Sequence, residues 1–543
     1  MSRTTTFDNE AVLDTAHVGD IQGALGTITN GDVAARSGLR RKLITLAAIV
    51  GPGLIVMAGD NDAGAFATYT QAGQNYGTRL LWTLALLIPV LYVAQEMVVR
   101  LGAVTGVGHA RLILERFGKF WGAFSVIDLF ILNALTIVTE FIGVSLAVTY
   151  LGLPKVPSVL VAGTAVVAAA STGSFRRFER ICLTLVAASL LLIPLYLMVH
   201  PPASQMAHGF AIPGLPVHSQ MSTVMLLIIG IVGTTVAPWQ LFFQQSYIID
   251  KRITPRFINY ERVDLWIGIV VVVVGAAALF GVAAAAFGGT SAFGNFTDTG
   301  GVASGLKHYV SPLVGDLFAI GLVDAAIIGA SAVGLSTSYA LSDVLGFKHS
   351  LHRKVTKAKG FYACYAGLMG LAAFLVLTPG VPLGLLTEAV QVLAGVLLPS
   401  AIVFLVLLCN DRDVLGPWAN TRRKNVIAAA IISVLVMMSV ILTASVLFPN
   451  ISSQAIVGIL AIGAVVAALV GVVLVVLGRR AKAGVVRVPV EWYDRNTWRM
   501  PPLNRLARPP MSLQRKIGLF TLRGYLMVAF IMVVVKVVSV ALH

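Results

Sequence analysis

The sequence predicts an all-α polytopic membrane protein, and three observations lead to this fold class. The chain has 543 residues, of which 57% are hydrophobic and only 12% are charged, whereas soluble domains carry about 25% charged residues. Apolar runs recur along almost the whole chain, and a run of about 20 residues crosses a hydrocarbon core as a helix. We find none of the short alternating segments that a membrane-spanning barrel requires.

Thirteen apolar runs are candidate membrane spans. The last run contains Arg523 and Lys536, although a lysine near one face of the bilayer can extend to the headgroups. The prediction is therefore a bundle of 12–13 spans. The runs cover residues 43–70, 79–101, 121–151, 156–174, 181–199, 221–248, 264–287, 312–343, 360–378, 383–408, 425–448, 453–478 and 518–541.

The gaps between the runs support this count because they alternate in charge. The chain carries a net charge of +16, and its Lys and Arg residues gather in every second gap. Cytoplasmic loops carry the excess of basic residues in membrane proteins. We therefore expect an integral protein of the cell membrane with a cytoplasmic N-terminus.

The chain divides into four regions. Residues 1–38 are polar and lack the apolar core of a signal peptide, which predicts a disordered cytoplasmic tail. Residues 39–478 hold spans 1–12 and form the expected transport domain. Residues 479–517 are rich in Arg and Pro and are expected to be a cytoplasmic linker. Residues 518–543 are expected to add a C-terminal transmembrane helix.

The sequence argues against an enzyme, a redox protein and a nucleic-acid-binding protein. Cys182, Cys364 and Cys409 form no CxxC pair, and the histidines fall in the gaps or near the ends of the chain. No hydrolase, metalloprotease or phosphate-loop motif stands in a suitable context. We expect no cofactor, no nucleic acid and no obligatory protein partner, so that the partners are the lipid bilayer and a transported solute.

The first span is interrupted in its middle. Its sequence from Gly51 to Gly64 reads GPGLIVMAGDNDAG, and Gly, Asp and Asn in such a run make a poor helix. A charged residue at mid-membrane depth costs about 3 kcal/mol or more, so Asp60 and Asp62 need water, a cation or a partner there. The backbone carbonyls that a broken helix frees are suitable ligands for hard cations.

The sixth span carries a matching interruption, with Gly230, Gly233, Thr234 and Thr235 before Ala237-Pro238. Pro238 has no N–H, so a nearby carbonyl is left free. Breaks five spans apart are what a five-helix repeat, inverted in the membrane, produces. The paired acids favour a cation site, while helix caps or a gate salt bridge remain the alternative for Asp60 and Asp62.

At these breaks the sequence resembles the Nramp family of divalent-metal transporters, over about residues 40–450. Family members carry GPG and then DPGN in the first span. Here the GPG is retained, and DPGN is replaced by Asp62-Ala63-Gly64-Ala65. The resemblance implies that Asp62 binds the metal. It also implies a leucine-transporter-type inverted repeat of five plus five helices, with broken helices 1 and 6 and extra C-terminal helices.

Other matches follow in the family's order along the chain. The tenth span keeps the family's glutamine eight residues before a proline, as Gln391 and Pro399, so the resemblance implies that Gln391 binds the metal or holds a water. A loop resembling the family's follows it. The remaining matches are QEMVVRLGAVTG at residues 95–106, FRRFERI at residues 175–181 and NDRDVLG at residues 410–416.

Departures from the family pattern point to the cargo. The family's metal-binding Asn is replaced by Ala65, and its Met-Pro-His in the sixth span is Ala237-Pro238-Trp239. A thioether favours softer transition metals, whereas oxygen ligands with room for water suit Mg²⁺. The Nramp-related magnesium transporters also lack this Met and carry DxDAG. We therefore expect Mg²⁺ as the cargo and Mn²⁺ as a second one, ahead of Ca²⁺ and Al³⁺.

Proton coupling is expected to be weak or absent. In the family, the proton route is linked to acids of the third span and to the lost histidine. Here Glu140 matches one acid, Ile137 replaces the other, and Trp239 cannot carry a proton. A second family histidine falls at Gln244. Glu140 is either functional or a buried acid hydrogen-bonded to a neighbouring helix.

Four further positions stay open between two interpretations. Glu96 is either an acid of the inner vestibule or a snorkelling or ion-paired residue. Asp324 lies either on the substrate path or in a helix-packing stripe with nearby Ser and Thr residues. Thr234 and Thr235 either offer oxygens to the metal or bond only to the local backbone.

The sequence therefore predicts a secondary transporter that takes up divalent cations by alternating access. A proton-coupled Mn²⁺/Fe²⁺ transporter of the Nramp type is the first alternative. A transporter of the same fold for an amino acid or amine, and a receptor or channel, are the others. The expected metal-site residues are Asp60, Asp62, Thr234, Thr235, Ala237 and Gln391, with Ala65, Glu96, Glu140, Trp239 and Asp324 beside them or on the path.

Overall fold

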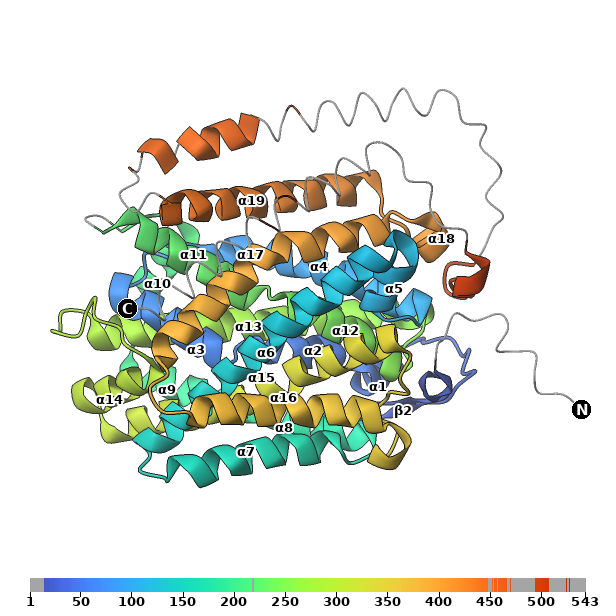
Figure 1. Cartoon of the computed structure of the whole chain (residues 1–543), viewed down its shortest axis with the longest axis horizontal. Coiled ribbons are helices and arrows are strands. Elements are labelled where there is room, and N and C mark those ends of the chain that lie inside the picture. Colours follow the sequence, from blue (N-terminus) through green and yellow to red (C-terminus); the bar gives the residue numbers. More distant parts are fainter. Residues whose placement is uncertain are drawn as a thin grey trace, which may run out of the picture.

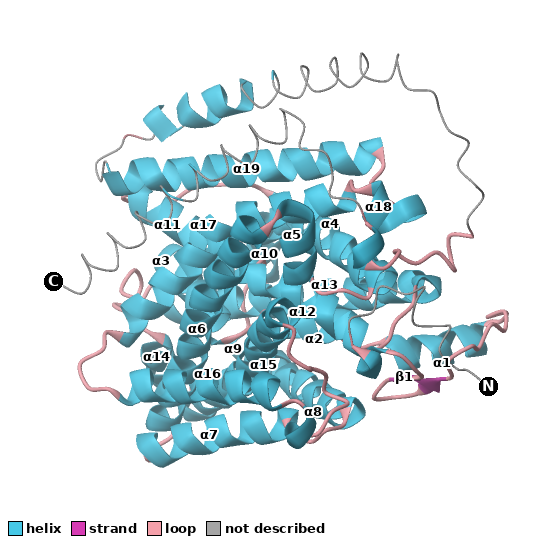
Figure 2. Cartoon of the chain, turned by 45° about the vertical axis from the view of Figure 1, so that its right-hand side comes forward, coloured by secondary structure: helices cyan, strands magenta, loops and turns pink. Residues whose placement is uncertain are grey.

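The computed structural model describes residues 14–216, 219–447, 452, 454–456, 458–465, 469, 494–506, 524 and 527. This part of the chain is a bundle of long helices with one two-stranded sheet (Figures 1 and 2). The first helices are α1 (Leu39–Ile49), α2 (Pro52–Ala58), α3 (Ala63–Tyr76), α4 (Trp82–Thr105), α5 (His109–Phe117), α6 (Lys119–Tyr150), α7 (Lys155–Ala170), α8 (Phe175–Ala188), α9 (Leu192–Val199) and α10 (Ala203–Ala211). They are followed by α11 (Met221–Thr235), α12 (Pro238–Asp250), α13 (Ile258–Phe287), α14 (Thr299–Tyr309), α15 (Pro312–Leu345), α16 (Lys359–Leu377), α17 (Leu383–Cys409), α18 (Arg412–Leu415) and α19 (Arg422–Leu447).

The predicted spans match these helices. Within the described residues, nine helices are long and apolar enough to cross a membrane, or ten if the bent pair α1 and α2 is one span. The shorter helix α7 occupies the predicted fourth span. The all-α prediction is confirmed. The predicted spans 453–478 and 518–541 and the linker 479–517 lie largely outside the described residues.

Both predicted helix breaks are present. The backbone is non-helical at residues 59–62, between α2 and α3, and at residues 236–237, between α11 and α12. The two interrupted helices pack in matching ways, because α2 and α3 lie on α13 while α11 and α12 lie on α4. Helix α6 packs along α15, and α11 packs along α17.

Close backbone packing holds the first broken helix in place. A side chain at Gly53 of α2 would lie 2.8 Å from the backbone of Leu265 on α13, and one at Gly268 would lie 2.7 Å from the Gly53 carbonyl oxygen. Small residues let membrane helices approach this closely. Met57 occupies the same contact, since its Cγ would be 2.7 Å from a Cβ at Gly268.

The polar N-terminal segment is partly ordered, which corrects the predicted disordered tail. Residues 14–34, called the strap below, include strands β1 (Ile21–Gln22) and β2 (Thr27–Ile28), which pair antiparallel. The strap has few apolar side chains to bury, and its polar composition is the reason that the sequence predicts disorder. The part of the prediction that covers residues 1–13 falls outside the described residues.

Arginines from three separate segments hold the strap, two by its backbone and one by the Asp14 side chain. Arg252 donates to the Ala16 carbonyl at 2.8 Å, and Arg180 donates to the Ala24 carbonyl at 3.0 Å. Arg353 forms an ion pair of 2.5 Å with Asp14. These arginines come from gaps that the charge alternation places on one side of the membrane, and the strands of the strap that they hold lie beside α1 (Figure 1).

A buried ionic cluster fixes the bend between α1 and α2, which is 53°. Lys251 donates to the Ile49 carbonyl at 2.6 Å and to Glu179 at 2.7 Å, while Asp264 accepts from the Gly53 N–H at 2.7 Å. Gly51 at the bend has a φ of 154° and touches Glu179, so a side chain there would be strained and would clash.

Candidate metal site

Asp62 forms the first turn of α3. It is the N-cap of this helix, and its Oδ1 accepts from the Ala65 N–H at 2.8 Å. The side chain is buried, with 3% of its surface exposed. The cap alternative therefore holds for Asp62, and capping uses one carboxylate oxygen. Its role as a metal ligand stays a prediction.

Asp60 lies in the unwound segment and caps no described helix. It is fully buried, its Oδ1 accepts a hydrogen bond from Gln240 Nε2, and its Oδ2 has no partner among the described residues. Sequence analysis missed Gln240. The only signal was a polar residue directly after Ala237-Pro238-Trp239, within a predicted membrane span.

Glu140 of α6 reaches the first turn of α3. Its Oε2 accepts from the Ala63 N–H at 3.0 Å, and its Oε2 and the Asp62 Cβ would lie 2.7 Å and 2.8 Å from a Cβ at Gly329 of α15. The Glu140 carboxyl group therefore lies beside Asp62. Its contacts agree with a buried acid bonded to a neighbouring helix, and a functional role for Glu140 stays a prediction.

The second break contributes two threonines with different surroundings. Thr235 Oγ1 donates to the Ile231 carbonyl at 2.6 Å and contacts the Tyr69 hydroxyl at 2.8 Å, so it serves the local backbone and α3. Thr234 Oγ1 is buried and has no partner in the described structure. Ala237 is the N-cap residue of α12 and is 5% exposed. Thr234 therefore fits a ligand role better than Thr235 does.

Gln391 of α17 reaches the same region. Its amide nitrogen lies so close to Gly64, in the first turn of α3, that any side chain at Gly64 would overlap it. That nitrogen has no hydrogen-bond partner among the described residues. The structure thus brings Gln391 beside α3, within the turn that Asp62 caps, while its predicted contact with a metal or water is not tested.

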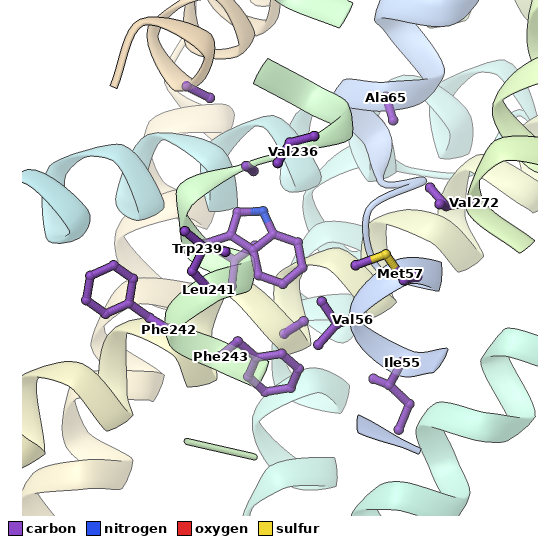
Figure 3. Close-up of a cluster of buried hydrophobic side chains, with 14 of the residues drawn as sticks. Ile55, Val56, Met57, Ala65, Val236, Trp239, Leu241, Phe242, Phe243 and Val272 are labelled. Atoms are coloured by element: carbon purple, nitrogen blue, oxygen red, sulfur yellow. The ribbon is translucent and has the colours of Figure 1, made fainter. Parts of the chain in front are cut away.

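Trp239 fills the space between the two broken helices. Figure 3 shows its indole on α12 pointing toward Val56 and Met57 of α2, below the unwound segment. The side chain is 1% exposed, and the Trp239 carbonyl accepts from Ser336 Oγ of α15 at 2.8 Å. Trp239 is therefore buried in the first turn of α12, against α2.

A small cavity lies on the opposite side of the aspartates. It starts at Ala63, directly after Asp62, and extends toward Asp298, whose Oδ1 caps α14 by accepting from the Gly301 N–H at 2.8 Å. Its lining residues are Ala63, Ala67, Thr139, Ile142, Gly143, Leu146, Phe296, Asp298, Thr299, Gly384 and Thr387.

Two predicted path residues lie apart from the aspartates. Glu96 pairs with Arg100 at 3.0 Å, Arg262 at 2.6 Å and Lys424 at 2.7 Å, so the ion-pair interpretation is correct and the vestibule role is not supported. Asp324 is buried with one oxygen unpartnered in the described structure. It lies one helical turn from Ile328, which packs near Gly59 at the first break. A path role for Asp324 stays a prediction.

The donors at the two breaks are oxygen and amide groups. The described residues contain no group of three or more His, Cys, Asp and Glu side chains that is arranged to hold a metal. A cation here would bind two carboxylates, amide and hydroxyl oxygens, free backbone carbonyls and water. Such a set suits hard divalent cations.

Comparison with known proteins adds the family context. Residues 53–445 match the family model described as natural resistance-associated macrophage protein-like. The chain is 26% identical over 422 residues to the divalent metal cation transporter MntH of Lacticaseibacillus casei, covering 74% of this chain and 90% of that protein. It is 28% identical over 420 residues to MntH of Ralstonia nicotianae, covering 73% and 90%.

Solved structures agree on the fold. A manganese transporter of Eremococcus coleocola, in complex with an aromatic bis-isothiourea substituted compound, superposes with a TM-score of 0.61 at 20% identity, over 83% of this chain and 96% of that one. MhsT in complex with L-phenylalanine superposes with a TM-score of 0.51 at 14% identity, over 73% and 98%. Both likenesses show the fold alone, and that fold is the predicted inverted repeat.

Proposed function

Since the chain belongs to the Nramp family, we propose that it is a secondary transporter of divalent metal cations, with Mg²⁺ as its preferred cargo and Mn²⁺ as a second one. The proposal extends the MntH relatives' activity as divalent metal cation transporters to this chain. No enzyme activity is implied, and the metal is cargo rather than a cofactor.

One observation carries the choice of cargo, namely two buried aspartates at the first break with alanines at both positions where the family has a softer or additional ligand. Asp60 and Asp62 are 0% and 3% exposed. Ala65 and Ala237 leave no side-chain donor, and Met57 packs against Gly268 of α13. Because Mg²⁺ dehydrates reluctantly, a site with few protein ligands and room for water favours it over softer metals.

Alternating access follows from the cavity and Trp239. The cavity begins at Ala63, directly after Asp62 in the chain, and we infer that Trp239, whose indole lies against α2 (Figure 3), closes the side of the site toward the strap. We infer from the basic loops that the strap side is cytoplasmic. A cation then enters from the outer side and binds at the aspartates. It leaves after α12 moves Trp239 away from α2, at the point where both helices are already broken.

We further propose that transport is uncoupled from protons. Ile137, Trp239 and Gln244 do not titrate, and they stand where the family pattern has titratable groups. Proton-coupled transport of the Nramp type is the second candidate, and a specific observation favours it. The buried Glu140 carboxyl group lies beside Asp62 and has one oxygen without a partner in the described structure, and a proton held there would be released when a cation binds at Asp62.

Liposome transport tests both proposals. The purified protein is reconstituted, and uptake of Mg²⁺, Mn²⁺, Ca²⁺ and Zn²⁺ is measured while a trapped dye reports internal pH. We expect Mg²⁺ and Mn²⁺ uptake without acidification. Zn²⁺ uptake with no Mg²⁺ uptake would contradict the hard-cation proposal, and acidification proportional to metal entry would establish the coupled alternative.

An amino acid or amine as cargo is less well supported. MhsT in complex with L-phenylalanine shares the fold. However, the first break carries two buried carboxylates, and a single amine would pair with one of them and leave the other unpaired. The same assay excludes this alternative if uptake of labelled amino acids matches that of protein-free liposomes.

A further inference from the structure

Two buried amides stand in series behind Asp60. Gln240 of α12 donates from Nε2 to Asp60 Oδ1, and Gln95 of α4 donates from Nε2 to Gln240 Oε1 at 2.9 Å. All three side chains are 0% exposed. The chain of hydrogen bonds therefore runs from the unwound segment of the first broken helix, through the second, into a third helix.

Nothing in the described structure fixes the far end of this chain. Gln95 Oε1 is buried and has no hydrogen-bond partner among the described residues, and Asp60 Oδ2 and Thr234 Oγ1 are likewise unpartnered. A partner at Gln95 Oε1 would lock the amides in one orientation. Without one, only the long contact of Gln240 Nε2 with the Thr235 carbonyl, at 3.4 Å, opposes rotation, and the group that occupies Asp60 decides which way the amides face.

An amide presents either a donor or an acceptor to the same neighbour. Rotation by half a turn about its last torsion exchanges the oxygen and the nitrogen, and this torsion is broad and roughly two-fold. If Gln240 and Gln95 rotate together, the hydrogen bond between them is kept with donor and acceptor reversed. Gln240 Oε1 then faces Asp60, an arrangement that is unfavourable unless a cation lies there.

We propose that the Gln240 side chain alternates between two roles, coordination of the metal and donation of a hydrogen bond to Asp60. We further propose that Gln95 positions it. With a divalent cation at Asp60, the Gln240 amide oxygen coordinates the ion. In the empty transporter the Gln240 N–H₂ group compensates the carboxylate. The inference rests on the proposed function and extends it to the return step of the cycle.

The return step explains why such a residue is useful. A carrier that works by alternating access must cross back empty, and a buried carboxylate with no partner is costly during that step. In a proton-coupled carrier a proton neutralises the acid. Here an amide donor does so without a proton, and an amide oxygen is also a hard ligand that suits Mg²⁺ and Mn²⁺.

Two substitutions at Gln240 separate these roles. Gln240→Leu removes both the ligand and the donor, so Mg²⁺ and Mn²⁺ binding to the purified protein should weaken by about tenfold. Gln240→Glu keeps an oxygen and supplies a donor only while its carboxyl group carries a proton. It should bind the cations at least as tightly as the wild type and show a larger cation-induced rise in melting temperature.

Transport assays give the decisive contrast. In an exchange assay with Mn²⁺ on both sides of the membrane, the carrier can return with a cation bound. Net uptake into liposomes without internal Mn²⁺ requires the carrier to return without a bound cation. At high pH, where the introduced carboxyl group is ionised, Gln240→Glu should keep exchange and lose most net uptake. Loss of binding, exchange and net uptake together would show a merely structural role, and a Gln240→Leu variant that behaves like the wild type would also overturn the proposal.

Controls keep the test independent of folding and of the proposed function. Gln74→Leu removes another buried amide of α3, one that donates to the Ala292 carbonyl at 2.9 Å, and should change neither assay. If Gln240→Leu does not fold, Gln95→Leu replaces it. That variant should weaken binding about threefold, and an unchanged affinity would contradict the positioning role. A wild type that moves no divalent cation refutes the proposed function, whereas a transporting wild type with unaffected variants refutes only this inference.

Discussion

At the first break, Asp62 combines a structural role with a proposed functional one. Asp62 caps α3 through the Ala65 N–H and is also the proposed ligand. Asp60 caps no described helix, and its Oδ1 accepts a hydrogen bond from Gln240. A substitution at Asp62 therefore has to be chosen so that it removes the charge and leaves the cap.

Asp62→Asn meets this condition. Asparagine caps helices about as well as aspartate, so the melting temperature without metal should change little, while loss of the charge should weaken Mg²⁺ binding by about a hundredfold or more. Isothermal titration and thermal unfolding measure the two effects. Asp62→Ala should lose binding and, in addition, about 1 kcal/mol of stability from the missing cap. Full binding by Asp62→Asn would move the metal site elsewhere.

His349 is a second residue whose state depends on its surroundings, and it lies in the loop between α15 and α16. Burial of the imidazole opposes its protonation, but Asp343, whose Oδ1 lies 3.1 Å from Nε2, outweighs burial. Together with the Phe347 carbonyl at 2.9 Å and the charge of Asp250, it raises the pKa of His349 to about 9. The ring also lies 5.2 Å from that of His17 in the strap.

The stability of this loop should therefore depend on pH. The pKa of His349 is higher in the folded protein than the ordinary value of about 6.5, so its stabilisation is complete below about pH 6.5 and is lost as the pH rises through about 9. The melting temperature of the wild type should fall more between pH 6.5 and pH 10 than that of His349→Gln. His308→Gln, at an exposed residue of α14, is the control, and equal pH profiles for the wild type and His349→Gln would contradict the assignment.

At the scale of the elements, the break between α11 and α12 sets the ligand type. Ala237 occupies the N-cap of α12 with φ −79° and ψ 144°, a backbone that any residue adopts. A larger side chain can therefore be introduced here without a change of the backbone, and we propose that metal preference is altered by one side chain at this position.

Ala237→Met tests this directly by supplying a thioether. The ratio of Mn²⁺ affinity to Mg²⁺ affinity should rise by about tenfold, because sulfur favours the softer ion. Competition binding with both ions measures the ratio. Ala366→Met, on the exposed face of α16, should leave it unchanged. A ratio that does not move in Ala237→Met would show that position 237 does not touch the cation.

At the scale of the whole molecule, the strap joins loops that belong to different helices. It is bonded to the first turn of α8, to the loop after α12 and to the loop between α15 and α16. Gly23 and Gly26 lie against Ala48 of α1 and cover it. These contacts hold α1 and α12 together on the side that Trp239 closes.

Removing residues 2–34 should therefore loosen that side. In a variant with Ala48→Cys, deletion should speed labelling by a membrane-impermeant maleimide in inside-out vesicles by about tenfold, because opening becomes more populated. Val33→Ala, at a strap position whose side chain is exposed, should label like the undeleted protein. Equal rates with and without the strap would show that it does not restrain α1.

The sequence by itself determined the fold class, the two breaks and the pair of aspartates, since each depends on local composition. Gly, Pro and Asp within an apolar run disrupt a helix wherever the run packs, and five-span spacing is visible in the chain order. The departures at Ala65 and Ala237 were equally visible from the motif alone.

Only the tertiary structure decided which polar groups meet. Gln240 is far from Asp60 in the chain and becomes its partner because α12 packs on α2, and Gln95 becomes the partner of Gln240 because α4 packs on α12. Glu96 forms ion pairs with basic side chains from three segments. The strap is held by arginines from distant segments of the chain. Hydrogen bonds and ion pairs depend on the position of both partners, and a sequence shows each partner without the distance between them.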